Sequence, residues 1–306
     1  MSEVIVNKIE YPVGLNKIEN SDFQHFILTQ FNLRNFPKAK NSAYDKWVDW
    51  TRERITLFEK YCLPSVLNQS EQNFTWILYF DEETPEEFSD FLEKMNSNPN
   101  IVIYYCNGAS GFQSDYMSPV LSRLTKGSDW VVTSRIDNDD CVHKDMVKKI
   151  QANIQFKHKF KVSLASGYAL DEQTKKLAHY YYPMSPFLSL VEKRDQARGV
   201  FERGHTVWEG LRLWIYKEIC IEWFASKSRM VRFVLRKPMW MQVIHQTNVS
   251  NSFHRGLPIM NEKELSDFGL NLKSKASQVN EISKYANYIH WKRYFKCTAI
   301  KILLRH

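Results

Sequence analysis

Three carboxylates follow directly on a short apolar segment near the middle of the chain. Residues 130–147 read WVVTSRIDNDDCVHKDMV, in which Asp137, Asn138, Asp139 and Asp140 form an acidic cluster. Alternate residues of an extended chain point to the same side, so Asp137 and Asp139 share one face. Mg²⁺ often takes only one or two oxygen ligands from protein and the rest from substrate phosphates and water. The spacing therefore predicts a metal and diphosphate site; a solvated acidic turn is the alternative.

Strand-like and helix-like segments alternate through the first half of the chain, which is typical of an open α/β sheet. Apolar segments predict strands at residues 26–31, 74–80, 101–105 and 130–133. Apolar periodicity and helix-start signals predict helices at residues 47–67, from Thr84, at residues 117–125 and after Lys144. Ligands of such sheets bind beyond the carboxyl ends of the strands. We therefore expect the residues that follow these strands to share one edge with the acidic cluster.

The second half of the chain has a different pattern, with short strands and loops. Strands are expected at residues 161–169, 178–182 and 240–244, the last of which stops at His245. The tail from residue 284 to residue 306 contains six Lys or Arg residues and no acid. Basic amphipathic helices with aromatic residues bind anionic membrane interfaces, which predicts peripheral membrane contact through residues 285–306. Packing of this helix on the rest of the chain is the alternative.

Composition restricts the class of protein. The chain has 306 residues, 43% hydrophobic residues and a formal net charge of +8, which indicates a globular protein with an anionic partner such as a phosphorylated ligand or a membrane surface. No motif for nucleic-acid recognition is present. The N-terminus lacks the apolar core of a secretory signal, and no apolar stretch is long enough to span a membrane, so a cytoplasmic location is predicted. The cysteines are scattered without a C-x-x-C pair, which predicts reduced thiols, at positions Cys62, Cys106, Cys141, Cys220 and Cys297.

Five segments of the chain together resemble a known family. They are FILTQFNLR (26–34), RxxLFEKYCLPSVxxQ (54–69), NFTWILYFD (73–81), SRIDNDD (134–140) and QVIHQTNVSN (242–251). In this order they are similar to the rhamnosyltransferase family of bacterial GT-A glycosyltransferases, relatives of the inverting group that includes cellulose and chitin synthases. The resemblance spans roughly residues 23 to 255.

The resemblance implies a fold and an activity. The fold would be a GT-A domain at residues 1–255, a Rossmann-like and mostly parallel sheet flanked by helices. Its nucleotide-sugar half would span about residues 23–145 and its acceptor half about residues 146–255, followed by a helical basic extension at residues 256–306. The activity would be inverting transfer of a sugar, rhamnose among the candidates, from a nucleotide-sugar donor to a glycan or lipid-linked acceptor. The cofactor would be Mg²⁺ or Mn²⁺.

The resemblance also assigns roles at the acidic cluster. Asp137 and Asp139 would bind the metal and the diphosphate, while Asn138 and Asp140 would shape the turn or reach the donor. His245 follows a strand, where GT-A enzymes often place a third metal ligand, and neutral imidazole suits that role. A buried or surface histidine without a ligand is the alternative.

Further residues are expected around the donor. The nucleoside is expected near Gln30, Phe31, Asn32 and Asp81. Arg135 offers a planar guanidinium that suits phosphate, and Arg54 is a second diphosphate candidate. Asp81 has an alternative as an ordinary turn residue before Thr84, and Arg54 as part of a solvated helix face.

An inverting transferase also needs a general base for the acceptor hydroxyl. The segment GHTVWEG (204–210) offers Glu209 and His205, and Asp171 is a further candidate. The alternative for each is a polar residue at the protein surface that has no part in catalysis. Two other functions stay open: a nucleotidyltransferase that makes activated sugars, and a non-catalytic glycan-binding module of the same fold. The glycine-rich loop typical of the nucleotidyltransferases is missing after the first strand.

Overall fold

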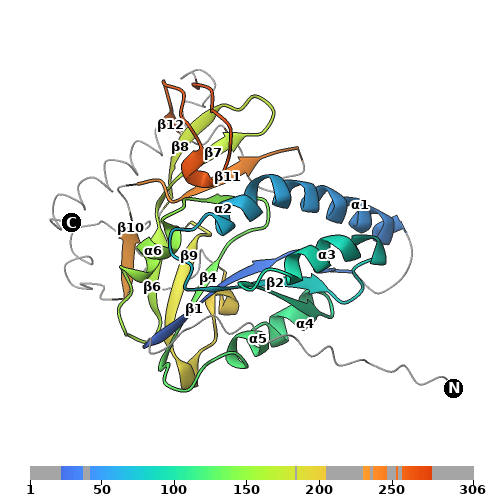
Figure 1. Cartoon of the computed structure of the whole chain (residues 1–306), viewed down its shortest axis with the longest axis vertical. Helices are drawn as coiled ribbons and strands as arrows, with labels where there is room; N and C mark the ends of the chain where they lie inside the picture. The colour runs from blue at the N-terminus through green and yellow to red at the C-terminus, as the bar shows by residue number, and fades with distance from the viewer. Residues whose placement is uncertain are drawn as a thin grey trace.

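The computed structural model contains two β-sheets that meet beside helix α1 (Figure 1). It describes residues 22–36, 42–182, 185–204, 230–234, 237–246, 253 and 257–277. The larger sheet has seven strands in the order β10-β6-β9-β4-β1-β2-β3, and the smaller has five in the order β12-β8-β7-β11-β5. This mixed α/β architecture with a mostly parallel central sheet confirms the predicted fold class.

The larger sheet is parallel in its first half. Its four parallel strands are β1 (Phe23–Gln30), β2 (Thr75–Asp81), β3 (Ile101–Cys106) and β4 (Trp130–Arg135). The remaining strands are β9 (Leu188–Lys193), which is antiparallel to β4 and to β6 (Phe160–Leu164), and β10 (Val231–Val234), which is parallel to β6. Because both faces are covered, β1 and β2 are buried along almost their whole length, and β2 is continuously apolar from Trp76 to Phe80.

Helices cover both faces of this sheet. On one face lie α1 (Ser42–Leu57), the π-helical turn η1 (Phe58–Cys62), α2 (Leu63–Leu67), α3 (Ser89–Asn96) and α6 (Met146–Gln151). On the other face lie α4 (Gly108–Asp115) and α5 (Ser118–Leu121). Alternate residues of β2 feed the two cores: Trp76 packs on the first face with Phe58, and Tyr79 on the second with Phe112. The acidic cluster therefore follows a strand that is fixed from both sides.

The smaller sheet carries His245 at its edge. Its strands are β5 (Cys141–Val142), β7 (Ser166–Asp171), β8 (Leu177–Tyr181), β11 (Trp240–Ile244) and β12 (Leu257–Pro258). The Trp240 ring lies over Gly167, where an added Cβ would be 2.1 Å from the ring. Trp240 also stacks on Phe187 with ring centroids 4.8 Å apart. Only glycine leaves room for this ring, so Gly167 and Trp240 together fix β11 against β7.

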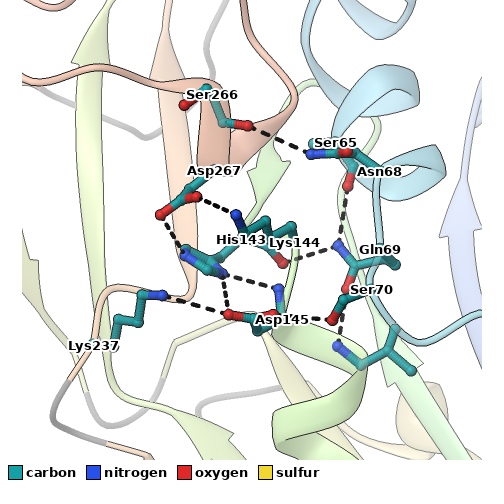
Figure 2. A network of polar contacts seen from close by, with 11 residues as sticks. Ser65, Asn68, Gln69, Ser70, His143, Lys144, Asp145, Lys237, Ser266 and Asp267 are labelled. Atoms are coloured by element: carbon teal, nitrogen blue, oxygen red, sulfur yellow. Dashed lines mark hydrogen bonds and ion pairs between the residues drawn. The ribbon is translucent and has the colours of Figure 1, made fainter.

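A polar network joins the smaller sheet to the helices of the larger one (Figure 2). His143 Nε2 lies 3.3 Å from Asp267 Oδ2, in the short 3₁₀ turn η6 (Ser266–Phe268), and Lys144 Nζ lies 2.8 Å from Asp267 Oδ1. Strand β12 pairs with β8. Residues 257–277 are thus part of the folded domain, which differs from the separate helical extension predicted for residues 256–306. Residues 278–306 lie outside the described part.

Three predicted elements differ in their bounds. The helix predicted at residues 47–67 is divided into α1, η1 and α2, with Pro64 in the first turn of α2. Thr84 does not cap a helix: its hydroxyl donates to the Asp81 carbonyl, and α3 begins only at Ser89 after the 3₁₀ turn η2 (Glu86–Phe88). The strand predicted at residues 161–169 is two strands, because the chain leaves the larger sheet at Ala165 and enters the smaller one.

Candidate active site

The carboxylate of Asp139 joins three segments that lie far apart in sequence. Its Oδ2 atom accepts a hydrogen bond from Arg54 Nη1, on α1. The same oxygen lies 3.0 Å from Nε2 of His245, the residue that follows β11. All three side chains are almost buried, with exposures of 11% for Asp139, 7% for Arg54 and 5% for His245. The loop after β4, the helix α1 and the end of β11 therefore meet at one carboxylate oxygen, on the edge predicted from the sequence.

Asp139 and Asp140 are adjacent, but their surroundings shift their pKa values in opposite directions. Burial alone would raise the pKa of Asp139, but the hydrogen bond from His245 and the charge and hydrogen bond of Arg54 more than offset it, so this pKa lies below its ordinary value. Burial and the charges of Asp139 and Asp137 hold the pKa of Asp140 well above its ordinary value. Asp140 Oδ1 accepts a hydrogen bond of 3.2 Å from the Val243 amide. Asp139 is therefore the buried anion, while Asp140 attaches β11 to the loop.

Asp137 pairs with Arg135, whereas Asp139 contacts Arg54 and His245. The Arg135 Nε and Nη2 atoms lie 3.1 and 3.0 Å from Asp137 Oδ1. The guanidinium also lies over the ring of Phe201, 5.3 Å from its centroid. The side chain of Asp137 is 39% exposed and that of Arg135 is 24% exposed, so this pair faces solvent at the site. Asn138 is buried, and its Nδ2 donates to the Phe31 carbonyl at 2.9 Å.

Two of the three predicted metal ligands are arranged so that they could bind one cation. Asp137 pairs with Arg135, so the set Asp137, Asp139 and His245 does not converge; among the described residues no group of three His, Cys, Asp or Glu side chains does so. Asp139 and His245 alone do converge, as an ionised carboxylate and an imidazole nitrogen. Two protein ligands suffice for Mg²⁺ or Mn²⁺ where phosphate oxygens and water complete the coordination. The residues present therefore fit a metal bound through this pair.

The residues predicted to hold the nucleoside are largely occupied by the protein itself. Phe31 is buried and stacks on Phe80 with ring centroids 4.3 Å apart. Asp81 is fully buried, with Oδ1 2.7 Å from Arg34 Nε and Oδ2 2.9 Å from the Arg34 amide. Asn32 Oδ1 accepts the Asp81 amide at 3.0 Å. These side chains support the end of β2, and their contact with a nucleoside stays a prediction.

Gln30 is exposed at the end of β1, as a ligand contact requires. Arg34 was not predicted to have a role in the site, although it lies within one of the quoted segments. Its contact with Asp81 spans 47 residues, and no short-range spacing signals such a pair. The exposed end of β1 therefore remains the part of the predicted nucleoside site that is open to a ligand.

Of the candidate bases, the structure describes Asp171. It pairs in register with Ile244, one residue before His245. Its Oδ1 accepts hydrogen bonds from the amide and the hydroxyl of Thr174, at 2.7 and 2.8 Å. Glu209 and His205 lie outside the described residues. Glu172, which the sequence did not single out, donates its amide to the Ile244 carbonyl at 2.8 Å and so also borders the site.

Comparisons with known proteins agree with the resemblance found in the sequence. A family model described as "Putative rhamnosyl transferase" matches residues 29–215, more than half of the chain. No curated protein matches. Among solved structures, residues 1–349 of S. aureus TarS align at 12% identity and a TM-score of 0.37, over 72% of this chain and 60% of that one. The chain thus spans less than two thirds of the TarS fragment.

Two further structures were compared. A protein described as a "putative nucleotide-diphospho-sugar transferase" from Desulfovibrio desulfuricans G20 aligns at 12% identity and a TM-score of 0.30, over 78% of this chain and 92% of that one. The bifunctional glycosyltransferase WbbM aligns at 11% identity and a TM-score of 0.26, over 49% of this chain and 24% of that one. On the match of the family model, the chain belongs to the rhamnosyl transferase family.

Proposed function

We propose that this chain is a metal-dependent inverting glycosyltransferase. It would move a sugar, with rhamnose the first to test, from a nucleotide-sugar donor to a glycan or lipid-linked acceptor of a bacterial surface polysaccharide. Membership in the rhamnosyl transferase family supports sugar transfer. The observation that carries the metal-dependent mechanism is the buried, ionised Asp139 carboxylate, which His245 contacts at 3.0 Å.

Sugar transfer requires that the departing nucleoside diphosphate be stabilised as its charge develops. A divalent cation, when bound, acts there as a Lewis acid. Asp139 and His245 would hold it, and Arg54 would keep Asp139 ionised and fixed in position. Arg135 is oriented by Asp137 and by the Phe201 ring, so its guanidinium is already placed to donate to a phosphate oxygen. These residues share the task of holding the diphosphate.

Inversion requires a base on the acceptor side of the sugar. The base takes the proton of the acceptor hydroxyl while that oxygen bonds to the anomeric carbon and the bond from that carbon to the diphosphate breaks. Asp171 is held beside the end of β11 by Thr174, with its side chain half-buried. Asp171, Glu209 and His205 all remain candidates for this role.

Nucleotide-sugar binding tests the proposal. Thermal shift with nucleoside diphosphates and nucleotide sugars, rhamnose donors first, should show stabilisation that requires Mn²⁺ and disappears with EDTA, because a ligand of the folded state raises its melting temperature. Asp139→Asn should lose this metal-dependent shift at almost unchanged side-chain volume. Asp195→Asn is the matched control, since Asp195 is exposed on the loop after β9. Equal shifts in both variants would contradict the metal site.

Slow release of nucleoside diphosphate from the donor, in the absence of acceptor, separates an enzyme from a glycan-binding module. A module would bind sugar without this release. Contact of residues 285–306 with an anionic membrane stays a prediction, because these residues lie outside the described part. Among the described helices, none combines the length and apolar composition needed to cross a membrane.

A further inference from the structure

The turn between β7 and β8 borders the candidate active site. Strand β7 lies beside β11 with Asp171 in register with Ile244, and the Glu172 amide donates to the Ile244 carbonyl at 2.8 Å. His245 follows Ile244 directly in sequence. Residues 172–176 therefore lie at the same edge as the proposed metal pair, on the side of the smaller sheet.

Two lysines converge on this turn and share one carboxylate. Lys60 Nζ lies 2.7 Å from Glu172 Oε1, and Lys175 Nζ lies 3.8 Å from the same oxygen. Lys175 Nζ also lies 3.2 Å from the Tyr61 hydroxyl and contacts the Glu172 carbonyl. Both ammonium groups lie near the Tyr61 ring, 5.1 and 5.9 Å from its centroid. The two ammonium groups thus share the Glu172 carboxylate, and Asp171 adds a second negative charge that acts on Lys175.

Lys176, the next residue of the turn, pairs with Lys275 through an isolated backbone bridge. Burial lowers the pKa of Lys175, and the charge of Lys60 lowers it further. The Lys175 ammonium is therefore held where water solvates it poorly and another cation repels it. An anion bound between the two lysines would relieve both effects.

Lys175 has a strained backbone conformation. Its φ angle is 60°, in the left-handed region that favours glycine, and a residue with a Cβ atom is strained there. Residues held in such conformations cluster at functional sites. Among the described residues other than glycine, Lys159 alone shares a positive φ, at 61°.

The lysine cluster and Asp139 contact opposite ends of one helical segment. Arg54 and Tyr61 are seven residues apart along α1 and η1, which corresponds to about 10 Å in helical structure. The Arg54 end contacts Asp139, and the Tyr61 end contacts the lysines. An anion at the lysines would thus be a second group, separate from the diphosphate of the donor.

We propose that Lys60 and Lys175 form an acceptor subsite that binds a phosphate group of the acceptor. This inference rests on the proposed function, because it assigns the group to the acceptor of that reaction. Lysine ammonium groups bind phosphate as point charges. The acceptor would then be a phosphorylated glycan or a phosphate-linked lipid, whose phosphate lies beside the hydroxyl that attacks.

Two glycine substitutions test the subsite. Lys175→Gly removes the ammonium group and relieves the positive φ, so the fold should be kept or stabilised. Lys159→Gly makes the same change at the other positive-φ lysine, away from the site. Inorganic phosphate is titrated at constant ionic strength with EDTA present, and its affinity is read from the melting temperature. We expect Lys175→Gly to lose about tenfold in phosphate affinity and Lys159→Gly to equal the native chain.

Lys60→Gln should reduce phosphate affinity as well, since it removes the second ammonium group from an exposed position on η1. Equal affinity in the native chain and Lys175→Gly, or an equal loss in Lys159→Gly, would overturn the subsite. Nucleoside diphosphate binding with Mn²⁺ is measured separately on the native chain and on Asp139→Asn. If the native chain fails to bind nucleoside diphosphate with Mn²⁺ but still binds phosphate through the lysines, the proposed function is overturned and the phosphate subsite is not.

Discussion

Arg54 is the residue on which the ionised state of Asp139 depends. Removing one partner of a buried ion pair leaves an uncompensated buried charge. The free-energy cost of that charge exceeds the net stabilisation that the intact pair provides. We expect Arg54→Met to lower the free energy of unfolding by about 3 kcal/mol at pH 7, measured by urea denaturation. Arg52→Met is the control, because Arg52 forms exposed ion pairs on the same helix, and it should change little.

The double variant Arg54→Met with Asp139→Asn separates charge from packing. With both charges removed, most of the lost stability should return. If the double variant is as unstable as Arg54→Met alone, the loss comes from packing against the Trp50 ring, which lies 4.9 Å from the guanidinium.

Asp140 should respond to pH in the opposite direction from Asp139. Its folded pKa is raised above the unfolded value of about 3.9, so the folded chain keeps a proton that the unfolded chain releases. This contribution to stability is present in full below the unfolded pKa and is lost as pH rises through the folded pKa. Asp140→Asn mimics the protonated acid and keeps an acceptor for the Val243 amide. The variant should therefore gain stability relative to the native chain between pH 4 and pH 7, in unfolding curves taken at several pH values.

The same measurement on Asp139→Asn provides the contrast. The folded pKa of Asp139 is lowered, so its contribution is present above the unfolded pKa and is lost as pH falls through the folded pKa. Asp139→Asn should thus lose most stability relative to the native chain near neutral pH. Parallel pH profiles for the two variants would contradict the assigned charge states.

At the scale of elements, the segment from β9 to the 3₁₀ turn η4 (Val200–Glu202) packs against Arg135. Glu192 is buried, and its Oε2 accepts the amides of Arg198 and Gly199 at 3.1 and 2.7 Å. The Val200 amide donates to the Thr133 hydroxyl at 2.9 Å, and Phe201 then lies against the Arg135 guanidinium. The buried Glu192 carboxylate therefore helps to position Arg135, a residue of the proposed donor site.

Gly199 is the tightest position in this loop. Its φ is +78°, and an added Cβ would lie 2.4 Å from Met117 Sδ and 2.9 Å from Tyr116 Cε2. Gly199→Ala should lower the free energy of unfolding by about 2 to 4 kcal/mol, from strain and overpacking together. Gly127→Ala isolates the strain, because its φ is +108° and no atom lies within 4 Å of the added Cβ. Chemical denaturation should give the larger loss for Gly199; equal losses would mean that Met117 moves aside at no cost.

Elements with a continuous apolar run were predictable from the sequence. Strand β4 and the acidic cluster were predicted because Trp130 to Thr133 is apolar and β-branched and the carboxylates follow at once. The end of β6 was not, since Ala165 lies inside one strand-like segment, residues 161–169, that is divided between the two sheets. Local sequence specifies a strand but carries no sign of the sheet it joins, which depends on contacts with distant strands.

The candidate site shows the same limit. Asp139 and His245 were predicted from type, position and resemblance, and the structure brings them together. The pairing of Arg34 with Asp81 and of Lys175 with Tyr61 was not predicted, because these pairs are 47 and 114 residues apart. The first contact follows from the parallel pairing of β1 with β2, and the second from the position of η1 beside the turn between β7 and β8; no sequence spacing encodes either.

On the scale of the whole molecule, the smaller sheet has a core of its own beside the larger core, to which it also contributes Val142, Tyr180 and Trp240. Tyr61 and Cys141 belong to the core of the smaller sheet, together with Met241 and Val243 of β11. Phe58, three residues before Tyr61, belongs to the core of the larger sheet. Consecutive turns of one helical segment thus contribute to both cores, so a displacement of α1 would disturb both sheets and the site at once.

The contact between Asp139 and His245 spans 106 residues. During synthesis the ribosome releases the larger sheet's parallel strands and the acidic cluster well before β11. A nascent chain at that stage has the carboxylates without the imidazole, and His245 arrives only with β11, which lies between β7 and β5 in the smaller sheet. Metal binding by this pair would then occur late in folding. An incomplete nascent chain would therefore not bind the nucleotide sugars that fully synthesised enzymes use.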